Sequence, residues 1–106
     1  MWVGLPVLTL MGQSFAGRAA ASALNALDMS ELITCTEDDY VAMAVELAAH
    51  PAKLAAIKAR LAQNMRSAPL FDTKRFARHI ESAYRAMHDR CLAGLPPDHI
   101  DVEGLP

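Results

Sequence analysis

The sequence predicts a helix-dominated α/β fold with two short parallel strands and about four helices. Short apolar runs of β type occupy residues 4–10 and 31–35, and an alanine-rich stretch with helical character lies between them. Three longer segments with helical spacing follow. Two strands joined by a helix form a parallel βαβ unit, in which the helix covers one face of the sheet.

The first strand leads into a glycine-containing loop. The run from Leu5 to Leu10 lies between two glycines and is typical of a strand covered on both faces. Gly12-Gln13-Ser14 then supplies a turn and an N-cap candidate, and the first helical pattern begins at Phe15. In open α/β sheets, ligands bind beyond the carboxyl ends of the strands, so this loop is the first place to look for a site.

Capping signals mark the next two helices. Thr36 is an N-cap candidate for a helix that should end near His50, and acidic residues at 37–39 complement the helix dipole in its first turn. Pro51 suits the first turn of another helix. That helix must end before Pro69, because the residue preceding a proline resists the α conformation.

The last helix is predicted from Thr73 to about Ala93, capped by Asp72 and followed by Gly94 at the C′ position. The helices before it carry apolar residues at helical spacing: Val41, Ala44, Val45 and Ala48 beside Tyr40, Met43 and Leu47, then Leu54, Ile57, Leu61 and Met65. The last helix carries Phe76, Ile80, Tyr84, Met87 and Cys91 along one face.

Length and composition limit the organisation and the partners. The 106 residues allow one domain, which we place at 1–97, followed by a flexible tail at 98–106. A formal net charge of −2 gives no basic excess for binding nucleic acid. No apolar run approaches the roughly 18 residues that a membrane span requires. The two cysteines, Cys35 and Cys91, indicate reduced thiols in a cytoplasmic protein.

The candidate binding residues are Gly12, Gln13, Ser14 and Arg18. A helix N-terminus offers unpaired N–H groups and a partial positive charge, so this loop could lie close to a nucleotide phosphate. Neither the GxGxxG nor the GxxxxGK[ST] pattern is present. The alternative is an ordinary strand-to-helix turn capped by Ser14, with Arg18 paired to a carboxylate.

No metal site, cofactor or catalytic residue is predicted. The histidines at positions 50, 79, 88 and 99 do not show the ligand spacing of a zinc site. Cys35 follows a predicted strand, but no histidine stands near it in the sequence to activate it as a nucleophile.

Several segments carry a family resemblance: Trp2-Val3-Gly4-Leu5-Pro6-Val7-Leu8-Thr9, Phe15-Ala16-Gly17-Arg18-Ala19-Ala20-Ala21-Ser22, Glu31-Leu32-Ile33-Thr34, Pro69-Leu70-Phe71-Asp72-Thr73, Ala83-Tyr84-Arg85-Ala86-Met87 and Gly94-Leu95-Pro96-Pro97. Together they resemble the C-terminal part of the catalytic region of O-linked N-acetylglucosamine transferases, especially bacterial SPINDLY-like proteins in which TPR repeats precede that region. Val3 and Met11 depart from the family pattern, which usually has alanine at the first position and proline or cysteine at the second.

The resemblance implies that residues 1–97 are the last part of the second Rossmann-like half of a GT-B glycosyltransferase. It implies a parent enzyme that transfers N-acetylglucosamine from UDP-N-acetylglucosamine to serine or threonine of an acceptor protein. In the family, the residues that grip the nucleotide lie mostly upstream of this segment. They include a histidine-threonine-threonine stretch and an aspartate, and the sequence has no counterpart of either.

We therefore expect a transferase fragment that is inactive alone, because transfer needs donor, acceptor and charge stabilisation held together. The alternative is a small helical interaction or oligomerisation module without catalysis. An unpaired strand edge at residues 5–10 would favour a homo-oligomer formed through the N-terminal strand.

Overall fold

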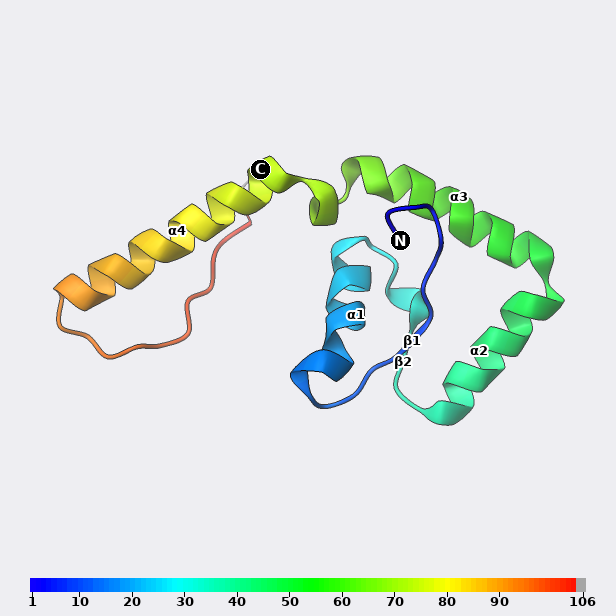
Figure 1. The fold of residues 1–106 in the computed structure, drawn as a ribbon. Helices are drawn as coiled ribbons and strands as arrows, with labels where there is room; N and C mark the ends of the chain where they lie inside the picture. The colour runs from blue at the N-terminus through cyan, green and yellow to red at the C-terminus, as the bar shows by residue number, and fades with distance from the viewer. Residues whose placement is uncertain (105–106) are drawn as a thin grey trace. The chain divides into compact units, whose positions relative to one another are not determined.

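The computed structural model describes residues 1–104, which form two compact units: Met1–Phe71, and the residues from Asp72 onward. The first unit contains, in chain order, β1 (Thr9–Leu10), α1 (Phe15–Ala26), the 3-10 turn η1 (Ser30–Leu32), β2 (Ile33–Thr34), α2 (Glu37–Ala49), α3 (Pro51–Ser67) and the 3-10 turn η2 (Pro69–Phe71). The second contains α4 (Thr73–Leu92) (Figure 1). The predicted fold class, helix-dominated with two parallel strands, is confirmed.

The two strands pair in parallel, with Thr9 opposite Ile33 and Leu10 opposite Thr34. The Thr34 side chain is buried, and its hydroxyl donates to the Thr9 carbonyl oxygen at 2.8 Å. This side-chain hydrogen bond links the two strands in addition to their few backbone hydrogen bonds. It also satisfies a polar group that would otherwise be costly to bury.

Both strands are shorter than the predicted 4–10 and 31–35. Only two residues of each run pair, and the second run begins instead with the turn η1. In the first run, Pro6 has no N–H to donate to a ladder, and Leu5 is exposed. The hydrophobic pattern therefore located the strands correctly but overestimated how far they pair.

The core of the first unit lies between α1, η1 and α3. Its buried members are Leu24, Leu27, Met29, Leu32, Ile57 and Leu61. The predicted seam on α3 is confirmed, because Ile57 and Leu61 are buried while Leu54 and Met65 on the same face are half-buried. The N-terminal segment reaches the far end of this unit, where the Trp2 ring meets Phe71 edge-on at a centroid distance of 5.0 Å.

α2 begins at the predicted cap. The Thr36 hydroxyl accepts a hydrogen bond from the Asp39 backbone N–H at 3.1 Å, and it lies 2.7 Å from the Asp39 carboxylate, to which it donates. At the other end, the His50 backbone N–H bonds to the Glu46 carbonyl oxygen at 3.0 Å, and Pro51 opens α3 as predicted. A side-chain cap thus marks the start of α2, and Pro51 marks its end by opening the next helix.

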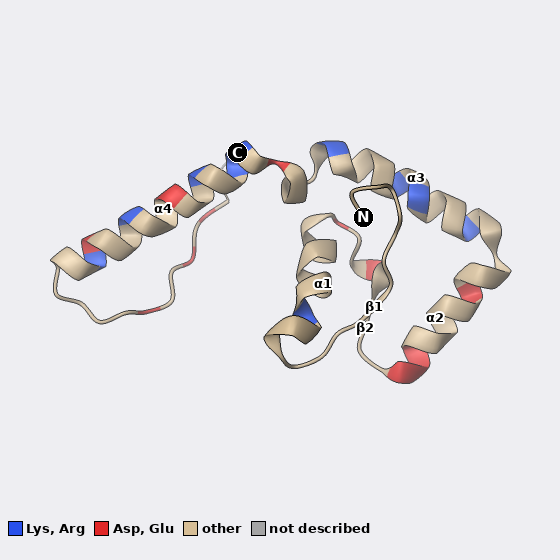
Figure 2. Ribbon diagram, viewed as in Figure 1, with Lys and Arg blue, Asp and Glu red and all other residues tan. Residues whose placement is uncertain are grey.

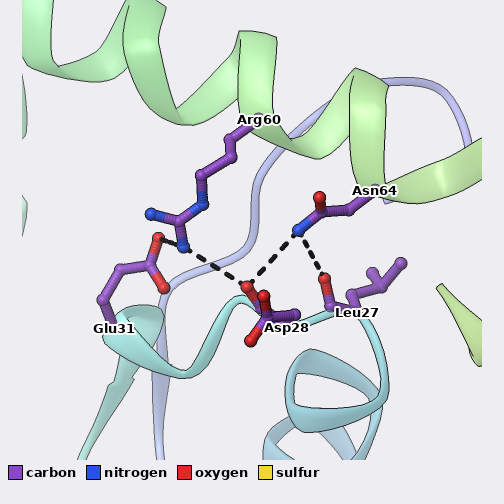
Figure 3. Close-up of polar contacts among 5 residues, drawn as sticks. All are labelled: Leu27, Asp28, Glu31, Arg60 and Asn64. Carbon is purple, nitrogen blue, oxygen red and sulfur yellow. Dashed lines mark hydrogen bonds and ion pairs between the residues drawn. The ribbon is translucent and has the colours of Figure 1, made fainter. Parts of the chain in front are cut away.

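Polar side chains of α3 hold the turn that follows α1 (Figure 3). The Asn64 amide donates to the Leu27 carbonyl oxygen at 2.8 Å and lies 3.4 Å from that of Asp28. Arg60 donates to the Asp28 carbonyl oxygen at 3.3 Å and forms an ion pair with Glu31. Asp28 itself has a φ of 55°, the left-handed conformation common after a helix. These contacts supply acceptors at the C-terminus of α1 with the partners that the helix cannot provide.

The second unit is built on α4. Asp72 caps it by accepting from the Arg75 backbone N–H at 2.9 Å, and Gly94 follows it with a φ of 67°, as predicted. Beyond the helix, Arg90 donates to the Pro96 carbonyl oxygen at 2.8 Å and lies 3.5 Å from the Asp98 carboxylate. The flexibility expected for residues 98–106 stays a prediction, and residues 105 and 106 lie outside the described part of the chain.

Candidate functional site

The loop between β1 and α1 lies at the carboxyl end of the small sheet. The Met11 backbone N–H donates to the Thr34 carbonyl oxygen at 2.8 Å, which extends the contact between the strands by one residue. The Gly12 N–H donates to the Gly17 carbonyl oxygen at 3.0 Å. A Cβ placed on Gly17 would lie only 3.2 Å from the Gly12 Cα, so this approach of loop and helix depends on the missing side chain.

Ser14 caps α1 as predicted. It has an extended backbone, and its hydroxyl oxygen accepts from the Gly17 N–H at 3.1 Å. The N–H groups of Phe15 and Ala16 come before that point in the first turn, where no intrahelical acceptor exists. The first turn of α1 contains no acidic residue. The positive end of its dipole is therefore not neutralised by its own side chains.

The start of α2 provides a contrast, because it follows the carboxyl end of the other strand of the same sheet. Its first turn contains Glu37, Asp38 and Asp39. Figure 2 shows this acidic start of α2, and the basic residue on α1 is Arg18. Of the two helix starts that follow the strands, only that of α1 is suited to an anion.

Arg18 lies one turn into α1 and is exposed. Within residues 1–104 it forms no hydrogen bond or ion pair, so the structural alternative of a paired Arg18 is not realised there. It borders an open hollow of about 580 Å³ lined by Met11, Phe15, Arg18, Ala19, Ala21, Ser22 and Asn25. Phe15, which also lines this hollow, is 93% exposed.

The four predicted binding residues fall into two sets, according to whether their polar groups already form hydrogen bonds within the loop. The Gly12 N–H and the Ser14 hydroxyl are used within the loop, whereas the Gln13 and Arg18 side chains are exposed. Sequence reasoning did not select the residues that share the hollow with Arg18, namely Phe15, Ser22 and Asn25. Together with Arg18 they are spaced three, four and three residues apart, which places them on one helix face and was a usable signal.

The side chains and helices of residues 1–104 form neither a metal-binding cluster nor a membrane span. No three His, Cys, Asp or Glu side chains among them are placed to hold a metal ion together. None of their helices is long and apolar enough to cross a membrane. Cys35 and Cys91 are both exposed free thiols.

Comparison with known proteins gives a consistent result. The sequence model of glycosyl transferase family 41 matches residues 1–80. The chain is 36% identical over 100 residues to a UDP-N-acetylglucosamine--peptide N-acetylglucosaminyltransferase of Caenorhabditis elegans, covering 94% of this chain and 9% of that protein.

Two plant proteins show the same pattern of coverage. The chain is 33% identical over 97 residues to the probable transferase SPINDLY of Hordeum vulgare, covering 92% of this chain and 10% of that protein. It is 32% identical over 103 residues to the probable transferase SEC of Arabidopsis thaliana, covering 96% and 10%. The chain therefore spans about a tenth of the length of these relatives.

Proposed function

Because the chain belongs to glycosyl transferase family 41, we propose that it is part of an enzyme that transfers N-acetylglucosamine from UDP-N-acetylglucosamine to serine or threonine of an acceptor protein. The observation that carries this proposal is the family match over residues 1–80, which includes β1, α1 and the loop between them. The two exposed free thiols support a reducing, cytoplasmic setting.

Within such an enzyme, the loop Gly12-Gln13-Ser14 and Arg18 would lie close to the phosphates of the nucleotide. Three features support this role: the unshared N–H groups at the start of α1, the absence of acid in its first turn, and the exposed guanidinium of Arg18. Arg18 would act by binding and orienting the diphosphate, since the residues that line the hollow include no carboxylate, histidine or cysteine beside it.

The test is a titration of the isotopically labelled chain with UDP, followed by amide NMR. We expect shifts concentrated at residues 12–18, and their loss in Arg18→Ala. Arg66→Ala is the matched control, because Arg66 is an exposed arginine of α3 beside a different hollow. No shifts at millimolar UDP, or shifts that survive Arg18→Ala and vanish in Arg66→Ala, would overturn the assignment of the loop.

This chain alone is expected not to catalyse transfer. One loop and one arginine can hold a phosphate, but they do not position an acceptor hydroxyl or stabilise the departing nucleotide on all sides. Incubation of the purified chain with UDP-N-acetylglucosamine and a mixture of peptides should release no UDP above the rate of spontaneous hydrolysis. Peptide glycosylation that Arg18→Ala abolishes would contradict this expectation.

The second candidate function is an interaction module that associates through the N-terminal strand. It is favoured by the exposure of Val3 (85%), Leu5 (59%) and Leu10 (38%) along that segment. Under this proposal Leu5→Lys lowers the mass measured by light scattering to that of a monomer. A mass that Leu5→Lys leaves unchanged would count against association at this edge.

A further inference from the structure

The segment that follows α4 lies along that helix, and we name residues 96–104 the C-terminal strap. At one end of the strap, Arg90 donates to the Pro96 carbonyl oxygen at 2.8 Å. At the other end, a Cβ placed on Gly104 would lie 4.0 Å from Nη2 of Arg75. The strap therefore runs antiparallel to α4, from its last turn back to its first, as the orange and red segment in Figure 1 shows.

The lengths of the helix and the strap agree with this path. Arg75 and Arg90 are 15 residues apart, which corresponds to about 22 Å along an α-helix. Asp98 and Gly104 are six residues apart, which corresponds to about 20 Å in an extended chain. An extended strap thus spans the distance between the two arginines, and its middle passes over the middle of α4.

The side of α4 that the strap follows is half-buried. We name it the strap face and define it by five half-buried residues: Arg75, His79, Ala83, Ala86 and Arg90. At about 100° per residue, these positions fall within an arc of about 80°. In the strap, Ile100 and Val102 are half-buried, and the residues at 101 and 103 between and after them are exposed. This alternation is that of an extended chain with one side turned toward the helix.

The charges of the strap and the helix are complementary. Residues 73–92 of α4 include five Lys and Arg but only two Asp and Glu, whereas the strap has three acidic residues and no Lys or Arg (Figure 2). Arg90 also lies 3.5 Å from the Asp98 carboxylate. Opposite charges at short range favour the closed strap, and dissolved salt weakens this attraction.

Closing the strap also has costs. Its nine residues lose backbone freedom when they are held against the helix. The Nε atoms of Arg75 and Arg90 are buried, and neither has a hydrogen-bond acceptor among residues 1–104. Burying a cationic N–H without an acceptor opposes the closed position, and opening the strap returns both N–H groups to water.

The contacts that hold the strap are few in comparison with these costs. They are one hydrogen bond from a guanidinium, one ion pair and two half-buried apolar side chains. The Asp98 side chain of the ion pair is 62% exposed, so that pair alone contributes little. Favourable and unfavourable terms are therefore close to balance, which is the condition for a segment that opens and closes.

We propose that the C-terminal strap is a releasable cover, which closes on the strap face and opens without unfolding α4. Arg90 is its latch, because both polar contacts at that end of the strap use the Arg90 guanidinium. When the strap opens, it uncovers within the second unit a flank of α4 that carries Arg75 and Arg90. This inference concerns the second unit alone and does not rest on the proposed function.

The first test is the backbone order parameter of residues 97–103, measured by ¹⁵N relaxation on the full chain at low ionic strength. We expect values above about 0.6 in the wild-type chain, with NOEs from the Ile100 methyl groups to α4, and values below about 0.6 without these NOEs in Arg90→Ala. Arg85→Ala is the matched control, because it removes an exposed arginine of the same helix. Circular dichroism should show nearly the same helix content in all three proteins.

A second pair of variants leaves the helix itself unchanged. Ile100→Asn removes one of the two half-buried apolar side chains of the strap and should lower the order parameters as Arg90→Ala does. His99→Asn introduces the same residue at the exposed neighbouring position and should leave them as they are. In the wild-type chain, about 1 M sodium chloride should also lower the order parameters, because it screens the attraction between the strap and the helix.

Four results would overturn the proposal. Order parameters below about 0.6 in the wild-type chain at low salt mean that the segment is a flexible tail. Equal values in the wild-type chain and Arg90→Ala mean that Arg90 is not a latch. Values that high salt leaves unchanged mean that the segment is fixed, and helix content that falls with release means that it is part of the fold of α4. None of these results depends on whether the α1 loop binds a nucleotide.

Discussion

Replacing Asn64 by alanine tests how the first unit closes the C-terminus of α1. The Asn64 amide is the hydrogen-bond donor to the Leu27 carbonyl oxygen at 2.8 Å, across 37 residues of sequence. Leu27 is fully buried, so water does not readily replace the lost donor. The neighbouring Asp28 carbonyl oxygen keeps its bond from Arg60 at 3.3 Å. The substitution therefore leaves mainly the Leu27 carbonyl oxygen without a donor.

The expected loss follows from two opposing effects. Leaving a buried acceptor without its donor costs about 1–3 kcal/mol. Alanine is a better helix former than asparagine and returns up to about 0.7 kcal/mol at this position of α3. We therefore expect Asn64→Ala to lower the free energy of unfolding by about 1 kcal/mol, which corresponds to a fall of about 4–8 °C in Tm for a unit of this size.

The assay uses the single tryptophan of the chain. Trp2 packs on Phe71 within the first unit, so its fluorescence reports the unfolding of that unit and not of α4. Urea titration should give a lower midpoint for Asn64→Ala with an unchanged slope. Gln63→Ala is the control, because it changes a neighbouring exposed amide on the same helix. Equal stability of the two variants would refute the reasoning.

Three further predictions concern turns and surface charge. Asp28→Val should destabilise the first unit by about 1–2 kcal/mol, whereas Asp28→Gly should leave its stability unchanged or raise it by up to about 1 kcal/mol, because glycine adopts a φ of 55° without strain; the same fluorescence titration measures both. Thr36→Ala should lower stability by about 1 kcal/mol through loss of the α2 cap, again seen as a lower urea midpoint. The hydrogen bond and charge of Lys53 lower the pKa of Glu46 from 4.5, so the stabilising effect of this pair is present above pH 4.5 and is lost as the pH falls through the lower value of the folded state. Carboxyl NMR should show the pKa of Glu46 rising toward its ordinary value in Lys53→Ala, and an unchanged titration would contradict the assignment.

The sequence predicted best what nearby residues decide. Ser14, Thr36 and Asp72 each cap a helix through a hydrogen bond to a backbone N–H three residues away, and Gly94 ends one through its own backbone conformation. Such contacts involve residues so close in the chain that spacing alone determines them. The hydrogen bonds from Asn64 and Arg60 to the turn after α1 have no such signal in the sequence. Their partners are 29–37 residues away and are brought together only by the fold.

The candidate site shows the same division. The loop residues and Arg18 could be selected because a strand, a glycine turn and a helix start follow one another in the chain. The sequence could not predict which of their polar groups remain free to bind a ligand. This depends on the bond from the Gly12 N–H to the Gly17 carbonyl oxygen and on the open face of α1. The structure leaves Arg18 as the exposed cation there, which makes it the residue whose replacement is most informative.

α2 shows why an apolar pattern does not by itself identify a buried face. Its sequence carries a stripe of small apolar residues beside a bulkier one, and both are consistent with packing. In the structure the bulkier stripe faces inward, where Leu47 packs against the core and Met43 is half-buried. Val41 and Val45 of the other stripe are 58% and 62% exposed. Two adjacent apolar stripes have the same period, so periodicity leaves the orientation of α2 open, and the tertiary packing turns the bulkier stripe inward.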